Sequence, residues 1–399
     1  MRKRQRMKIA LVSQEYPPET AKGGLGTQAY LKAHGMADRG HEVHVISQLG
    51  QTDEVKERMD GAVRVMRIPG CYDRLNIQSP AVEWLTYSAE VAVALDRLHR
   101  ERPLDLIEFP EWGGEGYIHL LNRSAQNRVP VVLHLHGPLV MFAHALKWPE
   151  LDSDFYRIGT EMERTCFRLA DAVFSSSRCS AHWCLEYYHQ RADEIPVIHT
   201  GVDTELFAPR PVPKNERPTI VFLGRLVRNK GPLVLFDACC RLVSEFPDLQ
   251  LHLIGNGEPA VIDELERKSR DFPGLLRRAP SISREQLAEE FSRAHIFAAP
   301  SVYEGGPGFV YLEAMACGLP VIGCSGSGLD EIISPGENGL LVAPNDSDAV
   351  AGALRSLLTD KTTREKMGGR AREWVLRHAR REDCLDRIEA FYQSVVARE

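Results

Sequence analysis

Two glutamates, Glu304 and Glu313, stand on either side of a glycine-rich segment in the second half of the chain. Residues 305–308 read Gly-Gly-Pro-Gly, which indicates a turn, and the apolar residues 309–317 predict a short helix that Gly318 ends. Glu313 has apolar neighbours at the helical three- and four-residue spacings, so we expect its carboxylate to be buried. A buried carboxylate needs donors, which come either from the protein or from a ligand with hydroxyl groups, such as a ribose.

A basic loop is predicted in the same half of the chain. A strand over residues 219–224 precedes Arg225 and Lys230, and a helix is predicted from Pro232 to about residue 245. Cations beside a helix N-terminus neutralise phosphate oxygens, although basic side chains in surface loops often have no function. Arg228 is expected to face solvent.

A glycine loop, Gly23-Gly-Leu-Gly26, precedes the first predicted helix, over residues 27–39. Free backbone N–H groups at a helix start suit an anion such as a diphosphate. The glycine spacing also fits the dinucleotide fingerprint, but nine residues separate it from the strand at 8–13 and the next strand lacks a terminal acid. These departures argue against a nicotinamide site. Together with the basic loop, the glycine loop predicts a diphosphate held from both halves.

His134 and His136 share one face of a strand predicted over residues 129–136. No third ligand follows at a metal-binding spacing, so we expect His134 to pack inside and His136, before Gly137, to hydrogen-bond a substrate. Two Asp-Ser-Asp segments, at 152–154 and 346–348, match a motif that binds metal in some enzymes. Helix starts explain both segments, and no obligatory metal is expected.

The elements that position these residues alternate between short apolar strands and amphipathic helices along 399 residues. Such alternation implies parallel sheets covered on both faces, so we predict an α/β protein of two doubly wound, Rossmann-like domains. The first domain spans residues 1–207, a proline-rich linker spans 208–218, and the second domain spans 219–375. A C-terminal helix over 376–399 is expected to return to the first domain. Further strands are predicted at 42–47, 104–109, 172–176, 249–254, 296–299 and 320–324.

Composition excludes several classes of protein. The net charge of −6 does not favour a nucleic-acid-binding surface. No run of eighteen apolar residues predicts a membrane span, and the basic residues 1–6 allow at most peripheral membrane contact. Nine cysteines without paired spacing argue against a disulfide framework, so we expect a cytoplasmic protein.

With these residues placed, the chain resembles the retaining glycosyltransferases of family 4, which have the two-domain GT-B fold. The likeness runs from about Lys8 to Tyr392 and is most specific in the second half. The matching segments there are Gly224-Arg225, Lys230-Gly231, Leu253-Ile-Gly-Asn-Gly-Glu258, Pro300-Ser301, Tyr303-Glu-Gly305, Leu312-Glu-Ala-Met-Ala-Cys-Gly-Leu-Pro-Val321 and Gly339-Leu-Leu-Val342. In the first half they are Gly23-Gly-Leu-Gly26, His136-Gly137 and Thr200-Gly-Val-Asp-Thr204.

The resemblance implies a site in a cleft between two facing domains. Arg225 and Lys230 would hold the diphosphate of a nucleotide-sugar donor, Glu313 its ribose, and Gly24 the phosphates from the opposite domain. Glu304 and the backbone of residues 306–309 would contact the transferred sugar, and His136 a sugar hydroxyl. The implied catalytic residues are Glu304, His136, Arg225 and Lys230. The implied donor-binding residues are Gly24, Arg225, Lys230, Gly255, Gly257, Gly306, Gly308, Phe309, Val310 and Glu313.

Some features depart from the family pattern or leave choices open. Eight residues separate Glu304 from Glu313 where the family usually has seven. The expected base-binding loop reads Ala279-Pro-Ser-Ile282, which lacks the usual glycine and leaves the nucleobase undetermined. The glycine loop beginning at Lys22 also resembles that of glycogen and starch synthases. On the acceptor side, Trp112 either stacks on a sugar ring or covers the edge of the core.

The resemblance therefore implies metal-independent transfer of a hexose, with retention, from a nucleotide diphosphate sugar that we expect to be UDP-linked. No cofactor other than this donor is expected. The acceptor is a small molecule, a glycan or a glycolipid, and the oligomeric state is left open. The alternatives are a GT-B-fold epimerase or phosphorylase, and a catalytically silent nucleotide-sugar-binding protein.

Overall fold

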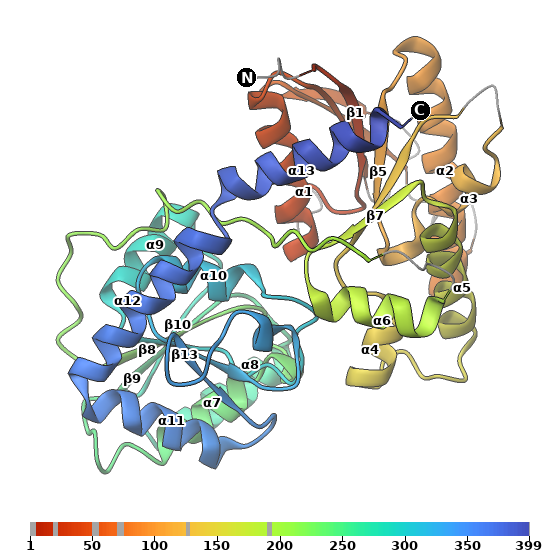
Figure 1. Cartoon of the computed structure of the whole chain (residues 1–399). Helices are drawn as coiled ribbons and strands as arrows, with labels where there is room; N and C mark the ends of the chain where they lie inside the picture. Colours follow the sequence, from red (N-terminus) through yellow and green to blue (C-terminus); the bar gives the residue numbers. More distant parts are fainter. Residues whose placement is uncertain are drawn as a thin grey trace. The chain divides into compact units, whose positions relative to one another are not determined.

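The computed structural model describes residues 5–18, 23–49, 56–69, 76–124, 128–189 and 194–398 (Figure 1). The chain divides into two compact units: unit 1 comprises Met1–His199 with Glu382–Glu399, and unit 2 comprises Thr200–Arg381. Lys22 and residues 1–4, which carry part of the glycine-loop and basic-terminus predictions, lie outside the described residues. No described helix is both long and apolar enough to cross a membrane.

Unit 1 is built on a seven-stranded sheet of order β3-β4-β2-β1-β5-β6-β7. The strands are β1 (Lys8–Val12), β2 (Glu42–Gln48), β3 (Lys56–Asp60), β4 (Val63–Ile68), β5 (Leu106–Pro110), β6 (Val131–Leu135) and β7 (Ala172–Ser175). Its helices are α1 (Gly24–Asp38), α2 (Pro80–Glu101), η2 (Trp112–Gly114), α3 (Tyr117–Leu121), α4 (Leu139–Leu146), α5 (Asp154–Leu169), α6 (Arg178–Tyr188) and α13 (Arg381–Val396). All neighbouring strands are parallel except β3 and β4.

Alternating side chains of the strands pack in two separate hydrophobic cores of unit 1. Ile9 and Leu11 of β1 pack in one core with side chains of α1 and α13. Ala10 and Val12 point the other way and pack with side chains of α2, α5 and α6. Because successive strand residues face opposite sides, this partition places helices on both faces of the sheet.

Unit 2 has a six-stranded, wholly parallel sheet of order β10-β9-β8-β11-β12-β13. The strands are β8 (Thr219–Leu223), β9 (Gln250–Ile254), β10 (Leu276–Ala279), β11 (Ile296–Ala298), β12 (Val321–Cys324) and β13 (Gly339–Val342). Its helices are η3 (Arg228–Lys230), α7 (Pro232–Cys240), α8 (Pro259–Ser269), α9 (Arg284–Arg293), α10 (Phe309–Ala316), η4 (Gly328–Glu331), α11 (Ser347–Thr359) and α12 (Lys361–His378). Two Rossmann-like sheets, one in each unit, confirm the predicted fold class.

The proline-rich residues 208–218 are part of unit 2 and hydrogen-bond to α9 and the turn after it. The N–H of Arg210 donates to Ser292 Oγ at 3.1 Å, and that of Asn215 donates to the carbonyl of Arg293 at 3.0 Å. Lys214 Nζ donates to the carbonyl of Ala294 at 2.5 Å. This segment is therefore held against the C-terminal end of α9 by two backbone amides and one lysine side chain.

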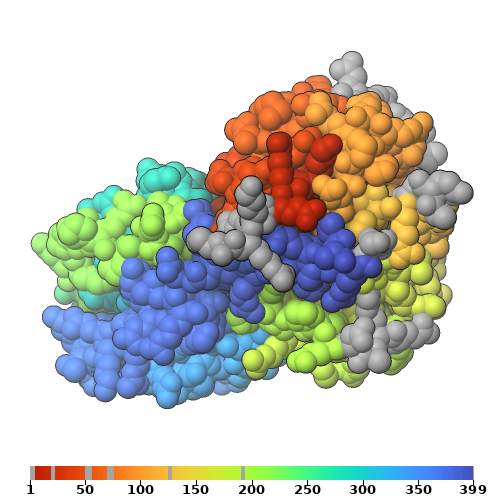
Figure 2. Space-filling model, turned by 45° about the horizontal axis from the view of Figure 1, so that its top comes forward, coloured from red at the N-terminus to blue at the C-terminus, as the bar shows by residue number. Residues whose placement is uncertain are grey.

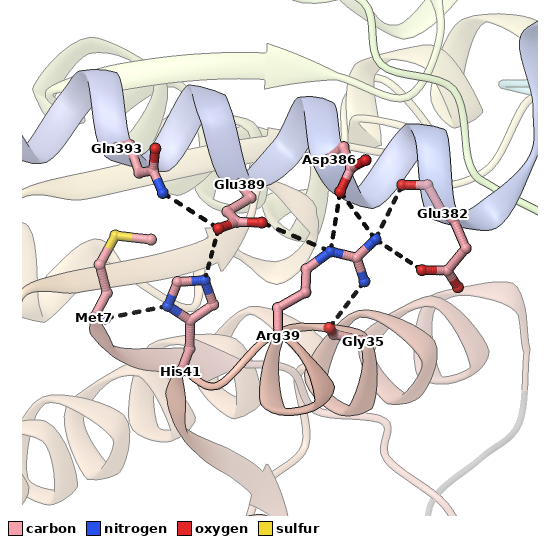
Figure 3. A network of polar contacts seen from close by, with 8 residues as sticks. All are labelled: Met7, Gly35, Arg39, His41, Glu382, Asp386, Glu389 and Gln393. Atoms are coloured by element: carbon pink, nitrogen blue, oxygen red, sulfur yellow. Dashed lines mark hydrogen bonds and ion pairs between the residues drawn. The ribbon is translucent and has the colours of Figure 1, made fainter. Parts of the chain in front are cut away.

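The last helix, α13, belongs to unit 1, which confirms the predicted return of the C-terminus to the first domain. Arg39, which caps α1, pairs with Glu382 at 2.8 Å and Asp386 at 3.2 Å, as Figure 3 shows. His41 lies 3.3 Å from the buried Glu389. In the space-filling view, the dark blue C-terminal residues lie beside the dark red N-terminal strand (Figure 2).

Candidate active site

Two loops of unit 2 pack backbone against backbone where β8 and β9 end. A Cβ atom on Gly255 would lie 2.1 Å from the carbonyl oxygen of Gly224, and one on Gly257 would lie 2.3 Å from that of Leu226. No real side chain fits at such distances, so both positions require glycine. The matching glycines of the family pattern thus have a structural reason here. They fix the path of the loop that carries Arg225.

Lys230 and Glu304 come together at this edge of the sheet. Lys230 Nζ donates to Glu304 Oε1 at 2.6 Å, and the N–H of Val302 donates to the carbonyl of Asn229 at 2.8 Å. Arg225 is exposed. Arg228 is also exposed, as expected, and pairs with Glu264 at 2.7 Å. The loop between β8 and α7 therefore carries an exposed guanidinium, that of Arg225, and an ammonium group that is paired with one carboxylate.

The glycine segment at 305–308 leads directly into α10. Gly308 has a φ of +57° immediately before the helix, a conformation that favours glycine. A Cβ on Gly328 would lie 2.5 Å from the Cα of Gly306, so these two backbones also touch. Phe309 and Val310 form the first turn of the helix.

Three helices at the predicted site begin at glycine without a side-chain cap. They are α1 at Gly23, α7 at Gly231 and α10 at Gly308. Helices α2, α5, α6, α9, α11 and α12 are each capped by a serine or aspartate side chain, whereas α3, α4 and α8 also lack a side-chain cap. The first-turn N–H groups of an uncapped helix are suited to an anion. In α1 the loop glycines Gly24 and Gly26 belong to the first turn itself, which starts earlier than predicted.

Glu313 is 3% exposed, which confirms its predicted burial. Its Oε1 lies 2.9 Å from Arg284 Nη2, at the start of α9. Burial raises the pKa of Glu313 to about 7, and the guanidinium opposes that rise. The protein thus supplies one partner for the buried carboxylate, which is the first of the two alternatives drawn from the sequence.

In unit 1, His136 lies in the turn between β6 and α4 and is half-buried. Its ring centroid is 3.9 Å from that of His134, which is fully buried, as predicted. Burial, then the neighbouring His134 and Lys32, hold the pKa of His136 well below its usual value. The imidazole is therefore neutral at pH 7 and available as a hydrogen-bonding group.

A buried polar cluster that the sequence did not reveal lies beside this histidine. Lys32 Nζ of α1 is 2.8 Å from His134 Nδ1 and also pairs with Glu108 of β5. Tyr392 of α13 donates to the other oxygen of Glu108. Lys32 is on the helix that the glycine loop begins, and Glu108 is on β5, the strand that leads to Trp112. Neither spacing nor residue type distinguishes these positions from ordinary surface charges.

A small cavity connects the glycine-loop helix with His136 within unit 1. It is lined by Leu11, Val12, Ser13, Leu25, Ala29, Lys32, Glu108, Pro110 and His136. Leu25 lies between Gly24 and Gly26, so the structure brings the beginning of α1 and His136 to one space. Ser13, Lys32, Glu108 and His136 give the cavity its polar wall.

Trp112 is half-buried in an aromatic cluster at the end of β5. Its ring centroid lies 5.2 Å from Trp84, 5.2 Å from Phe142 and 6.4 Å from Trp148. Trp112 thus covers the edge of a small core, and Trp148 is 53% exposed beside it.

The Asp-Ser-Asp segments lie at helix starts, as predicted. Asp346 caps α11 by accepting from the N–H of Ala349 at 2.8 Å, and Ser153 caps α5 with Asp154 in its first turn. Asp348 pairs with Arg241 at 2.6 Å. Over the described part of the chain, no group of three or more His, Cys, Asp or Glu side chains is arranged to hold a metal ion.

Two Rossmann-like sheets, one in each unit and each with a glycine-rich loop before a helix, are the architecture of a GT-B-type enzyme. Residues 22–206 match the family described as Glycosyltransferase Family 4, and residues 203–374 match Glycosyl transferases group 1. The chain belongs to these retaining glycosyltransferases, enzymes that use nucleotide-sugar donors. This confirms the resemblance found in the sequence.

Individual proteins similar to the chain cover more than nine-tenths of its length. A GDP-mannose-dependent alpha-(1-6)-phosphatidylinositol monomannoside mannosyltransferase of Mycolicibacterium smegmatis is 29% identical over 92% of this chain and 94% of its own. Among solved structures, sucrose-phosphate synthase from Thermosynechococcus elongatus superposes with a TM-score of 0.81 at 23% identity, covering 99% of this chain and 100% of its own. HepE of Anabaena, in complex with UDP and glucose, gives a TM-score of 0.74 at 20% identity over 97% and 100%. The structural likenesses support the GT-B fold.

Proposed function

We propose that the protein transfers a hexose from a UDP-sugar to a small-molecule, glycan or glycolipid acceptor with retention of configuration and without a metal ion. The observation that carries this proposal is the pairing of Lys230 with Glu304 beside the uncapped starts of α7 and α10. Transfer requires that negative charge growing on the leaving diphosphate be stabilised. An ammonium group, a guanidinium and free helix N–H groups supply that stabilisation without metal.

The proposed roles divide between the two ends of the donor. Arg225 and Lys230 bind the diphosphate, and Gly24 contributes phosphate contacts from unit 1. Glu304 and the backbone of residues 306–309 bind the transferred sugar. In the bound state, ribose hydroxyls donate to Glu313, which then shares its carboxylate between the ribose and Arg284.

His136 contributes a neutral imidazole to a hydroxyl of the transferred sugar. Its low pKa, caused first by burial, keeps it uncharged, so it does not repel the positive charge that develops at the reacting sugar carbon. The eight described cysteines are free thiols, which fits the cytoplasmic location that we propose.

The UDP preference rests on the expected base-binding loop. Residues 279–282 contain no carboxylate, whereas a carboxylate is the natural acceptor for the donor edge of guanine. The similarity to a GDP-mannose-dependent relative makes GDP-mannose the leading alternative donor.

The experiment offers the purified protein UDP-glucose, UDP-N-acetylglucosamine, UDP-galactose, GDP-mannose and ADP-glucose, and measures nucleotide released by slow transfer to water. We expect release from one UDP-hexose, and we expect it to persist in EDTA. Release from GDP-mannose alone would overturn the UDP assignment. Binding without release from any donor would favour a silent binding protein, and conversion of the sugar without an acceptor would favour an epimerase.

A further inference from the structure

The turn that carries His136 is held by a buried carboxylate. Glu111 Oε1 accepts the main-chain N–H of His136 at 2.6 Å and also that of Gly137. The N–H of Glu111 donates to the carbonyl of His134 at 3.2 Å, so β5 and β6 stay joined one residue beyond their ladder. Glu111 has no exposed surface.

A second buried carboxylate continues this arrangement along the chain. Glu163 of α5 accepts the N–H of Leu139 at 2.8 Å and that of Gly113 at 3.3 Å, and Tyr188 donates its hydroxyl to Glu163 at 2.5 Å. Pro138 has no N–H. Every main-chain N–H from residue 136 to residue 139 therefore donates to Glu111 or Glu163, and both of these side chains are fully buried.

The opposite side of the turn is fixed as well. Ser180 donates its hydroxyl to the carbonyl of His136 at 2.9 Å. A Cβ on Gly137 would lie 2.9 Å from Met141 Cε and 3.3 Å from the ring of Phe142, so the turn has no room to shift toward α4. The imidazole of His136 is thereby directed to the wall of the cavity.

Using two buried carboxylates to accept the amide hydrogen bonds of one turn costs free energy. Burial disfavours the charged form of each, and their like charges oppose one another. Burial raises the pKa of Glu111 to about 7, while the N–H groups of Gly137 and His136 lower it. A serine or asparagine cap satisfies one turn amide without that cost. Departures from the least costly arrangement are expected at functional sites.

We propose that Glu111 is a positioning residue for His136: by accepting both amides of the turn, it fixes the direction of the imidazole toward the transferred sugar. This inference rests on the proposed contact between His136 and the donor sugar. It assigns no contact with substrate to Glu111 itself.

The test measures nucleotide release from the donors named above for Glu111→Ala, Glu111→Gln, His136→Ala and the Glu111→Ala/His136→Ala double variant. Misplacing a reacting group by about 1 Å costs roughly 100-fold in rate, so we expect Glu111→Ala to lower kcat by roughly 10- to 100-fold. Donor Kd, measured by calorimetry, should stay within roughly twofold, because most proposed donor contacts are in unit 2. Glu111→Gln keeps an oxygen for both amides and should retain most activity.

The double variant separates positioning from general stability. If Glu111 acts through His136, Glu111→Ala should change kcat by less than roughly threefold in the His136→Ala background. Glu389→Gln is the matched control, since Glu389 is also buried in unit 1 but pairs with Arg39 and His41 on α13's side of the sheet. This control should keep the parent kcat.

Several results would overturn the inference. One is an unchanged kcat for Glu111→Ala. Another is an equal loss of kcat when Glu111→Ala is made in the parent and in the His136→Ala background. If Glu111→Ala fails to fold, Glu111→Asp replaces it, because the shorter side chain cannot reach both amides. For that variant, the inference requires both faster hydrogen exchange at residues 136–137 and a reduced kcat. Full activity of His136→Ala would instead refute the proposed role of His136, and with it this inference. No release from any donor would refute the proposed function itself.

Discussion

At the scale of single residues, the chain uses buried carboxylates for different purposes. Glu313 is paired with an arginine side chain, whereas Glu111 and Glu163 accept main-chain amides. Glu304 is nearer to solvent and pairs with Lys230. These partners predict different consequences when each carboxylate is removed.

Glu313→Ala should weaken UDP binding by roughly 1–3 kcal/mol, the usual cost of leaving polar partners unpaired. Glu304→Ala should leave nucleotide binding near the parent value and depress turnover, because its proposed partner is the sugar. Calorimetry with UDP and the release assay measure the two effects. Glu264→Ala is the control, because Glu264 forms an ion pair with Arg228, which faces solvent and has no proposed contact with the donor. Parent-like UDP binding by Glu313→Ala would refute the ribose assignment.

The pKa of Glu313 also predicts a pH dependence of stability. Its pKa is about 7 in the folded protein and about 4.5 when unfolded, so between these values the folded state binds more protons. Stability contributed by this residue should therefore fall as pH rises from 5 to 8, by at most about 3 kcal/mol. Denaturant unfolding of the parent and of Glu313→Gln should show this as a pH-dependent difference. A parent that gains stability relative to the variant over this range would mean that Arg284 outweighs burial.

At the scale of elements, the sequence predicted most of the strands that are buried on both faces, although not β4, which is also buried. It missed β3 and β10, which are edge strands with the sequences Lys-Glu-Arg-Met-Asp and Leu-Arg-Arg-Ala. Charged side chains are common on edges because they discourage pairing with other chains, and they hide the apolar period. It also missed β4 and β13. The antiparallel pairing of β3 with β4 corrects the expectation of a wholly parallel first sheet.

The same limit applies to the site. Glu313 and the glycine loops were predictable because burial and turns leave local sequence patterns. Lys32, Glu111 and Glu163 were not, since their partners lie 24 to 102 positions away in the chain. Only the assembled sheet of unit 1 brings them together.

The close approach of the β8 and β9 loops gives a prediction at this scale. Gly257→Ala should destabilise the protein by roughly 1–3 kcal/mol, because its Cβ would meet Leu226 backbone and force the two loops apart. Arg225 would move with its loop, so UDP binding should weaken too. Gly352→Ala, in α11 with open space around it, should be neutral or stabilising. Thermal unfolding measures the stability of both variants, and calorimetry measures their UDP binding. Equal stabilities of the two variants would contradict the prediction.

At the scale of the whole molecule, the chain crosses between its units twice. Residues 199–200 make one crossing and residues 381–382 the other. Within unit 2 the two crossing segments are tied together, since the N–H of Val202 donates to the carbonyl of Ala379 at 2.9 Å and that of Arg381 donates back to Val202. Two adjacent connections of this kind are suited to a hinge.

The proposed function places donor contacts in both units, and this gives the last prediction. UDP-sugar at saturation should slow hydrogen exchange in residues 23–26 of unit 1, although most proposed donor contacts lie beyond residue 224. Lys230→Ala should reduce that protection at a fixed donor concentration, because it weakens the phosphate contact in unit 2. Helix α2 serves as the internal control and should exchange at an unchanged rate. Unchanged exchange at residues 23–26 with donor bound would confine the donor to unit 2 and remove Gly24 from the site.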